Sequence, residues 1–148
     1  MPSPPSDLQR SRHELRRKVL ARRNTVPPVV ARHAAEAAGR HLAASAPFRA
    51  AEHVAGYIAL AGELDPAPLL HTAFGTGKAV YLPCVLDAQH MEFVRWQAND
   101  PLQPNRFGIL EPTPDPTRIL APEVLDLVLV PLLGFDARGN RLGFGGGY

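Results

Sequence analysis

Residues 53–60 read HVAGYIAL, an apolar stretch whose length and composition are typical of a buried strand. Asp65 and Pro66 follow after a short loop. They predict a helix that runs to about Phe74, because aspartate caps helices and proline suits their first turn. Residues 78–85 (KAVYLPCV) then predict a second strand. Two strands separated by a helix indicate an α/β layer fold.

The amino-terminal part of the chain is predicted to be helical. Residues 7–23 form the first helix, and the spacing of Ser6 and Gln9 matches a capping box at its start. Residues 29–46 are rich in alanine and predict a second helix, which we expect Pro47 to end.

The remaining sequence adds strands and one long irregular segment. Residues 91–96 (MEFVRW) predict a third strand, and residues 126–131 (DLVLVP) predict a fully apolar strand of the kind buried in a parallel sheet. Residues 99–117 contain five prolines and predict an irregular excursion over the surface. We see no internal repeat, so residues 1–148 are expected to form a single domain.

The ending of the sequence is unusual. Residues 134–148 (GFDARGNRLGFGGGY) hold six of the 12 glycines. A glycine loop after a buried strand normally leads into a helix whose N-terminus serves the loop. Because no helix follows Tyr148, we expect the sequence to be a truncated form of a longer domain.

Composition excludes several classes of protein. The 148 residues are 45% apolar and 20% charged, which excludes a disordered chain. No apolar run approaches the roughly 18 residues of a membrane span, and no secretory signal precedes the first helix. The single cysteine, Cys84, excludes a disulfide scaffold and fits the reducing cytosol. Seven basic residues and one acid lie between Arg10 and Arg23, so the basic charge is a local feature.

The glycine loop predicts phosphate binding. Without side chains, the backbone N–H groups of Gly143 and of residues 145–147 can approach an anion, and Arg141 can grip a phosphate with two N–H groups. The loop matches neither the P-loop nor the dinucleotide motif, because no lysine follows its glycines and Tyr148 replaces the last dinucleotide glycine. A flexible tail or a tight turn is the plainer alternative.

Two further features are candidates for binding residues. Arg12 and Arg16 lie one helical turn apart and could hold a polyphosphate, although a solvated basic face or a nucleic-acid contact would give the same pattern. Glu63 follows the strand at residues 53–60 and could bind a heterocycle with paired N–H donors, or it could be an exposed loop acid. The six histidines show no metal-ligand spacing, and Cys84 is expected in the core.

The run from Pro131 to Tyr148 resembles the P-x-x-x-F-D-x-x-G-x-R-L-G-x-G-x-G-Y signature of the 5-formyltetrahydrofolate cyclo-ligase family. Shorter matches support it at Leu15-Arg16, at residues 62–65 (GELD), at residues 80–83 (VYLP) and at residues 108–112 (GILEP). The resemblance extends over nearly all of the chain from about Leu8 onward.

This resemblance implies a three-layer α/β/α sandwich with a mainly parallel sheet, incomplete here at the C-terminus. It also implies a nucleotide-binding ligase of folate and one-carbon metabolism, which closes 5-formyltetrahydrofolate to 5,10-methenyltetrahydrofolate and releases ADP and phosphate. The formyl oxygen would attack the γ-phosphate of ATP, N10 would attack the activated carbon, and phosphate would leave. Such chemistry asks the protein mainly for positioning and charge neutralisation.

Site residues follow from the same resemblance. Tyr57, Ile58 and Glu63 would contact the folate, and Arg141 and Tyr148 would be the catalytic residues. The residues expected to bind ATP are Arg12, Arg16, Arg141, Leu142, Gly143, Phe144, Gly145, Gly146, Gly147 and Tyr148.

ATP and Mg²⁺ are the expected cofactors. In the family, Mg²⁺ is linked with an aspartate that follows the signature, beyond Tyr148, so no metal ligand is assigned in this sequence. We expect a cytoplasmic monomer with a small-molecule substrate and without a nucleic-acid or membrane partner. The alternative is a catalytically impaired chain that retains only nucleotide or folate binding.

Overall fold

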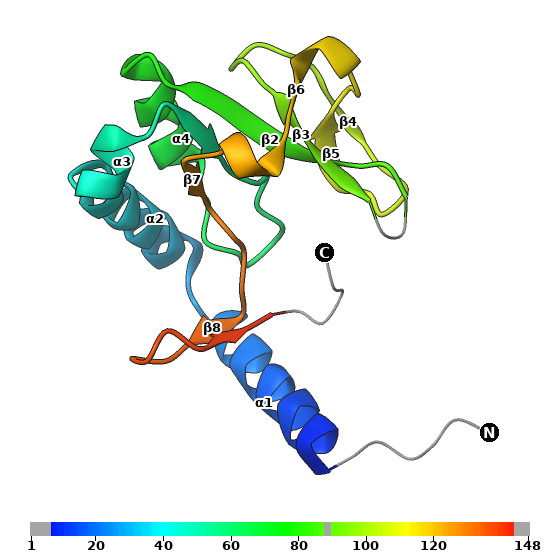
Figure 1. Ribbon diagram of the computed structural model, residues 1–148. Helices are drawn as coiled ribbons and strands as arrows, with labels where there is room; N and C mark the ends of the chain where they lie inside the picture. The colour runs from blue at the N-terminus through cyan, green and yellow to red at the C-terminus, as the bar shows by residue number, and fades with distance from the viewer. Residues whose placement is uncertain (1–6, 88–89, 144–148) are drawn as a thin grey trace.

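The computed structural model describes residues 7–87 and 90–143 (Figure 1). The predicted cap Ser6 lies outside these residues. So do the last five predicted ATP contacts, which are Phe144, Gly145, Gly146, Gly147 and Tyr148.

Helices dominate the first half of the chain, and short strands dominate the second. The first half forms α1 (Asp7–Arg23), α2 (Pro28–Ala43), α3 (Ala46–Ala50), β1 (His53–Ala55) and α4 (Ala67–Gly75). The second half forms β2 (Ala79–Val85), β3 (Met91–Arg95), β4 (Leu102–Pro104), β5 (Leu110–Pro112), the 3₁₀ turn η1 (Pro116–Arg118), β6 (Ile119–Leu120), a second 3₁₀ turn η2 (Pro122–Val124), β7 (Leu127–Val128), β8 (Gly134–Phe135) and β9 (Arg141–Leu142).

Five strands form one mixed sheet in the order β6-β3-β2-β1-β7. Strand β1 runs parallel to both of its neighbours, with His53 opposite Ala79 of β2 and Val54 opposite Leu127 of β7. Strand β3 runs antiparallel to β2 and to β6. The predicted α/β class is confirmed. The end of β1 lies at the carboxyl edge of the parallel strands, where ligands bind in sheets of this kind.

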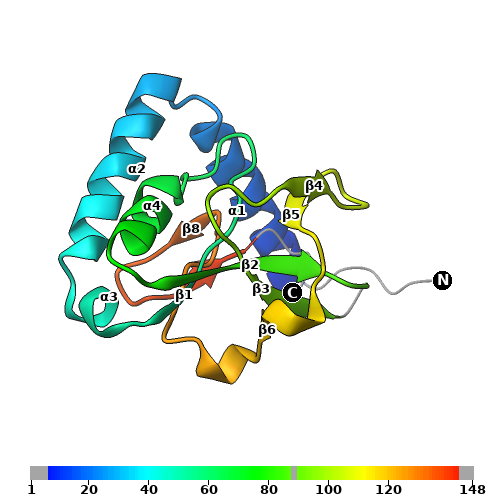
Figure 2. The same ribbon diagram turned by 90° about the horizontal axis from the view of Figure 1, so that it is seen from above.

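Helices α2 and α4 cover one face of the sheet (Figure 2). Leu69 and Leu70 of α4 are buried against strand residues such as Leu82. Gly56 permits this approach, because a Cβ at Gly56 would lie only 2.8 Å from a methyl carbon of Leu70. The other face packs Tyr81 against Leu125, in the segment that follows β6. The helices and the sheet are two of the three layers that the resemblance implies.

Two predictions in the first half need correction. Pro47 does not end a helix but lies in the first turn of α3, a position that tolerates proline, and Ser45 caps that turn by accepting a bond from Phe48 N–H. The strand predicted at residues 53–60 stops at Ala55. Beyond it, residues 57–64 close into a loop through side-chain bonds, so their apolar side chains line a hollow instead of extending the sheet.

The segment predicted as a fully buried strand at residues 126–131 is instead an edge strand. Only Leu127 and Val128 form β7, which pairs with β1 on one side. Burial therefore alternates along the segment, and Val128 and Val130 are 42% and 53% exposed. An edge strand covered on one face leaves every second side chain in contact with solvent.

The irregular excursion predicted for residues 99–117 contains the antiparallel pair β4–β5. The buried carboxylate of Glu111 fixes this pair against β2 by accepting hydrogen bonds from Val85 N–H at 3.1 Å and from Asn105 Nδ2 at 2.9 Å. Cys84 Sγ lies 3.6 Å from the other carboxylate oxygen. Burial, with the Glu111 charge, raises the pKa of Cys84 to about 11, so the thiol stays protonated, as expected for a core cysteine.

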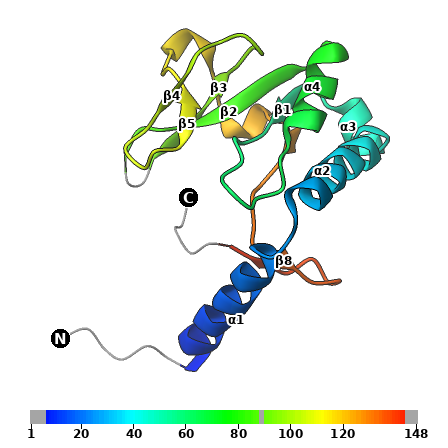
Figure 3. The same cartoon turned by 180° about the vertical axis from the view of Figure 1, so that it is seen from behind.

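Helix α1 extends away from the sheet, next to the two-stranded ribbon β8–β9 (Figure 1 and Figure 3). Val19 of α1 faces the ribbon, because its Cγ1 would lie 3.6 Å from a Cβ added to Gly134. Within residues 7–87 and 90–143, no helix combines the length and the hydropathy needed to cross a membrane.

Candidate active site

The three residues predicted to contact folate line one hollow at the carboxyl end of β1. Tyr57, Ile58 and Glu63 belong to the loop that follows the strand, and the hollow has a volume of about 430 Å³. Leu70 of α4 and Trp96, just after β3, complete its apolar wall. The structure therefore brings together side chains that the sequence places up to six residues apart.

Glu63 has a local role that the sequence did not indicate. Its Oε2 accepts a hydrogen bond from Leu60 N–H at 2.9 Å, and its own N–H donates to the Leu60 carbonyl at 3.0 Å. These two bonds close a tight turn, so Glu63 is neither a free loop acid nor a side chain reserved for a ligand. The half-buried carboxylate still lines the hollow and keeps lone pairs available for a ligand with N–H donors.

Tyr57 closes the same loop at its other end. Its phenol donates to the Leu64 carbonyl at 2.6 Å. Burial raises the pKa of Tyr57 to about 12, and the negative charges of Glu63 and Asp65 act in the same direction. The phenol is therefore a protonated hydrogen-bond donor throughout the neutral range.

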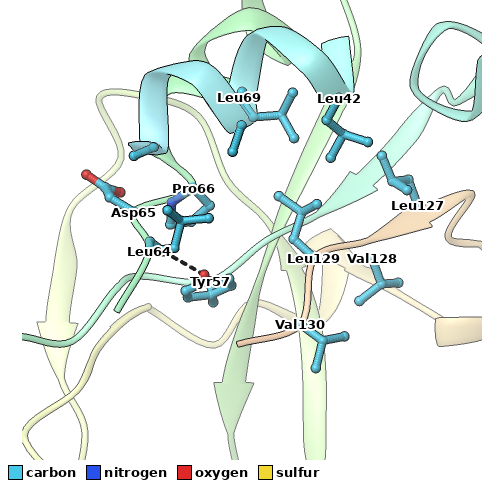
Figure 4. A pocket seen from close by; sticks show the side chains of 13 residues that line it. Leu42, Tyr57, Leu64, Asp65, Pro66, Leu69, Leu127, Val128, Leu129 and Val130 are labelled. Atoms are coloured by element: carbon cyan, nitrogen blue, oxygen red, sulfur yellow. Dashed lines mark hydrogen bonds between the residues drawn. The ribbon is translucent and has the colours of Figure 1, made fainter. Parts of the chain in front are cut away.

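Tyr57 also borders a second, more apolar hollow of about 340 Å³ (Figure 4). Leu42 of α2 and Leu69 of α4 form one wall, and Leu127 and Leu129 at the sheet edge form the other. Tyr57 and Asp65 line both hollows and so mark the boundary between them.

Arg16 reaches from α1 to the described start of the glycine loop. Its Nε donates to the Gly143 carbonyl at 2.9 Å across 127 residues of sequence. Arg12, one turn earlier, is exposed and makes no hydrogen bond with the described part of the loop. Of the two arginines on α1 that were predicted to bind phosphate, the structure therefore places one against the start of the loop.

Arg141 lies on β9, opposite Phe135 of β8. Its side chain is exposed, and no described residue forms a hydrogen bond or an ion pair with its guanidinium. Leu142 follows and accepts a hydrogen bond from Leu133 N–H at 2.8 Å, which closes the ribbon directly before Gly143. Toward the described residues, the guanidinium donors of Arg141 are therefore not engaged.

Asp136 holds the turn between β8 and β9. The Asp136 carbonyl accepts from Gly139 N–H at 3.0 Å, and its carboxylate accepts from Arg138 N–H and from the side chain and N–H of Asn140. The bonds from Asn140 are the main reason that the pKa of Asp136 lies below its ordinary value of 3.8. These hydrogen bonds therefore fix the turn at one end of the β8–β9 ribbon, which carries Arg141.

Helix α1 lies near both the β8–β9 ribbon and the loop of residues 57–64, which we call the folate loop after its expected ligand. Arg16 bonds to Gly143, while a Cβ added to Gly62 would lie 3.4 Å from Arg23 Nε at the other end of the helix. Seven residues of helix correspond to a rise of about 10 Å. Gly143 and Gly62 thus lie near the same helix about two turns apart.

Sequence reasoning missed several residues near the site. His71 of α4 also lines the hollow of Tyr57, Ile58 and Glu63, which we call the folate hollow after its expected ligand, and nothing in the local sequence marks His71. Glu111 could have been noted as the acid in a run of apolar and proline residues, but its partner Asn105 lies in an irregular stretch. In the described part of the chain, no group of three or more histidine, cysteine or acidic side chains could hold a metal ion.

Known proteins are similar to this chain in sequence and in fold. A model of the 5-formyltetrahydrofolate cyclo-ligase family matches residues 8–148. The chain is 33% identical to the 5-formyltetrahydrofolate cyclo-ligase of Escherichia coli K12 over 132 residues, which cover 88% of this chain and 72% of that protein. It is 35% identical to the Haemophilus influenzae protein of the same name over 102 residues, and it spans 54% of that relative's length.

Solved structures agree with these relatives. The NMR structure of Aquifex aeolicus 5,10-methenyltetrahydrofolate synthetase aligns with a TM-score of 0.81 and 33% identity, covering 93% of this chain and 69% of that one. The Mycoplasma pneumoniae 5,10-methenyltetrahydrofolate synthetase, at 21% identity and a TM-score of 0.69, shares the fold. The family match extends over almost the whole sequence, so this chain belongs to the 5-formyltetrahydrofolate cyclo-ligase family.

Proposed function

We propose that this chain catalyses the ATP-dependent conversion of 5-formyltetrahydrofolate to 5,10-methenyltetrahydrofolate, with release of ADP and phosphate. The observation that carries the proposal is the shared hollow of Tyr57, Ile58 and Glu63 at the carboxyl end of β1. Family membership supports it, and so does the contact of Arg16 with the glycine loop.

The hollow suits the pterin end of a folate. Its apolar wall of Ile58, Leu70 and Trp96 can pack on a flat heterocycle. The Glu63 carboxylate can accept the paired N–H donors that a pterin presents, and its turn with Leu60 holds it in place. Tyr57 fixes the opposite end of the same loop.

The phosphate side is assigned to α1 and to the end of the sequence. We propose that Arg12, Arg16 and Arg141 neutralise the phosphates of ATP, and that the backbone N–H groups of Leu142 and Gly143 contribute to the cradle. The residues that follow, Phe144, Gly145, Gly146, Gly147 and Tyr148, keep the same predicted role, with Tyr148 and Arg141 as the catalytic residues.

The proposed chemistry has two steps. The formyl oxygen attacks the γ-phosphorus of ATP and displaces ADP, which leaves a phosphorylated iminium species at N5. N10 then attacks the formyl carbon and loses its proton, and the former formyl oxygen departs with inorganic phosphate. Arg141 would stabilise the charge that develops on the transferred phosphoryl group.

Metal, assembly and location complete the proposal. The described residues form no Mg²⁺ site of their own, so no step is assigned to the ion. We propose that any Mg²⁺ is held mainly by ATP phosphates and water, as is usual for nucleotide enzymes. We further propose a cytoplasmic monomer without a nucleic-acid or membrane partner.

Steady-state kinetics with Glu63→Gln test this function. Methenyltetrahydrofolate formation is followed by absorbance, with ATP and folate varied separately. The wild-type chain should form product only with ATP, and Glu63→Gln should raise the KM for folate roughly tenfold or more at an unchanged KM for ATP. Glu52→Gln, at the amino edge of the sheet, is the matched control and should behave as wild type. Absence of ATP-dependent product would refute the proposal.

A further inference from the structure

Arg16 uses its guanidinium in an unusual way for a phosphate ligand. The Nε points at a backbone carbonyl, that of Gly143, at 2.9 Å. A guanidinium is planar and carries five N–H donors, so engaging Nε fixes the plane while the four terminal N–H donors remain available. The side chain is half-buried, whereas Arg12 one turn earlier is exposed.

The carbonyl that Arg16 holds lies at a defined point of the chain. Leu142, directly before it, closes the β8–β9 ribbon by accepting from Leu133 N–H at 2.8 Å. Gly143 therefore sits at the end of the ribbon and at the start of the glycine-rich sequence. A Cβ added to Gly143 would meet no described heavy atom within 4 Å, so side-chain packing does not hold this residue. The Arg16 bond is the described contact that orients its peptide group.

We propose that Arg16 is a positioning residue, which acts through the Gly143 carbonyl to hold the start of the glycine loop for phosphoryl transfer. The proposal rests on the proposed function and assigns Arg16 a task different from that of Arg12. Holding the carbonyl toward α1 fixes the direction of the peptide group to which it belongs, and fixed peptide groups are a condition for a preorganised anion site.

Lysine separates positioning from simple charge neutralisation. Arg16→Lys keeps the positive charge but loses the planar fork, so a single ammonium cannot hold the carbonyl and also face a phosphate in the same geometry. A residue that only supplies charge should tolerate lysine. A residue that positions the loop through its planar guanidinium should lose function when lysine replaces it.

The test compares Arg16→Lys with Arg17→Lys in the full chain. Arg17 is an exposed neighbour on the same helix with no assigned role. Arg16→Lys should lower kcat roughly tenfold while the KM for ATP changes less than about threefold, and Arg17→Lys should match wild type. The Kd for folate and the Tm should stay at wild-type values in both variants. A wild-type kcat for Arg16→Lys, or an increase in KM for ATP alone, would overturn the proposal.

Amide hydrogen exchange gives a second readout that needs no activity. Loss of the Arg16 bond should speed exchange of Leu133 N–H, which closes the ribbon beside Gly143, by roughly fivefold or more. Unchanged exchange in Arg16→Lys would contradict the positioning role. If the wild-type chain lacked ATP-dependent turnover, the proposed function would fail, while this exchange measurement would still decide whether Arg16 orders the ribbon.

Discussion

The phenolic oxygen of Tyr57 lies 2.6 Å from the carbonyl oxygen of Leu64 and donates a hydrogen bond to it. This bond spans the loop that carries Glu63 and separates two hollows, one lined by α2 and the sheet edge and the other by α4 and Trp96. The position of the Glu63 carboxylate therefore depends on a bond made by its neighbour in the same loop.

Tyr57→Phe should loosen the folate loop without disturbing the core. The loss of one partly buried hydrogen bond is worth about 1 kcal/mol, so the Kd for folate should rise roughly fivefold while the KM for ATP stays constant. Binding titrations with folate and steady-state kinetics with ATP measure the two effects. A folate Kd equal to that of wild type would show that the bond does not shape the hollow.

The Tyr57 phenol can donate to the Leu64 carbonyl only while it is protonated, so the pKa of Tyr57 sets the pH range of this hydrogen bond. Because the folded pKa is about 12 and the ordinary value is 10.0, the stabilisation is fully present below pH 10 and is lost as the pH rises toward 12. The difference in the free energy of unfolding between wild type and Tyr57→Phe, measured by chemical denaturation, should therefore stay constant from pH 7 to pH 9.

Arg141→Ala should reduce turnover by roughly a hundredfold or more, which is the scale of losing one well-placed electrostatic contact in a transition state. Folate binding should be largely unchanged, because Arg141 lies on the ribbon and does not line the folate hollow. Arg141→Lys should restore only part of the rate, because lysine lacks the fork. The measurements are kcat with ATP and folate varied separately, and the Kd for folate.

Arg138→Ala is the matched control for this variant, because Arg138 is exposed in the turn of the same ribbon. Its side chain can be removed while its N–H still donates to Asp136. Equal losses of turnover in Arg138→Ala and Arg141→Ala would mean that general charge, and not the position of Arg141, is responsible.

The Asp126 carboxylate should make a pH-dependent contribution to the stability of the fold at the start of β1. Its Oδ2 accepts from the N–H groups of His53 at 2.8 Å and Glu52 at 2.9 Å, and these bonds hold the pKa of Asp126 below its ordinary value of 3.8. A lowered pKa stabilises the fold above about pH 4, and the effect is lost as the pH falls through the folded value.

Asp126→Asn should therefore lower the Tm near pH 7, and the gap to wild type should narrow at pH 3. His53 Nδ1 lies 3.4 Å from the same carboxylate oxygen, so the comparison is repeated in a His53→Gln background to remove imidazole protonation. Thermal unfolding at pH 7, 5 and 3 provides the data. A gap of constant size over this range would contradict the role of the Asp126 charge.

Local sequence patterns predicted those elements that are specified by residues close to them in the sequence. Helix α4 follows from a proline-marked start and strand β2 from an apolar run of strand length. The expected cap is wrong by one position: Pro66 is the N-cap, and Asp65 accepts a hydrogen bond from Ala67 N–H before the helix. The Asp136 turn was likewise predictable, because aspartate and glycine at this spacing close a turn with their own backbone.

Features set by distant contacts were not predictable in this way. Residues 57–60 look like strand, and only the bonds from Tyr57 to Leu64 and from Leu60 to Glu63 reveal a loop. The edge position of β7 depends on sheet order, which local composition does not encode. The hydrogen bond from Asn105 to Glu111 joins the β4–β5 turn to β5, and the irregular sequence there does not indicate this pair.

The same division holds for the candidate site. Glycines and an arginine near the end of the sequence indicate an anion site by their chemistry alone. The role of Arg16 could not be resolved from sequence, because a phosphate ligand and a carbonyl ligand on a basic helix have the same pattern. The contact with Gly143 reveals the carbonyl as one partner of Arg16, and it joins residues 127 positions apart.

Isotope transfer from the formyl group tests the central claim most directly. The full chain is incubated with ATP and with 5-formyltetrahydrofolate that carries ¹⁸O in its formyl group, and the inorganic phosphate is analysed by mass spectrometry. If the formyl oxygen attacks the γ-phosphorus, each methenyltetrahydrofolate formed should yield one phosphate with one ¹⁸O atom. Product formed with unlabelled phosphate, or phosphate released from ATP without ring closure, would contradict the proposed reaction.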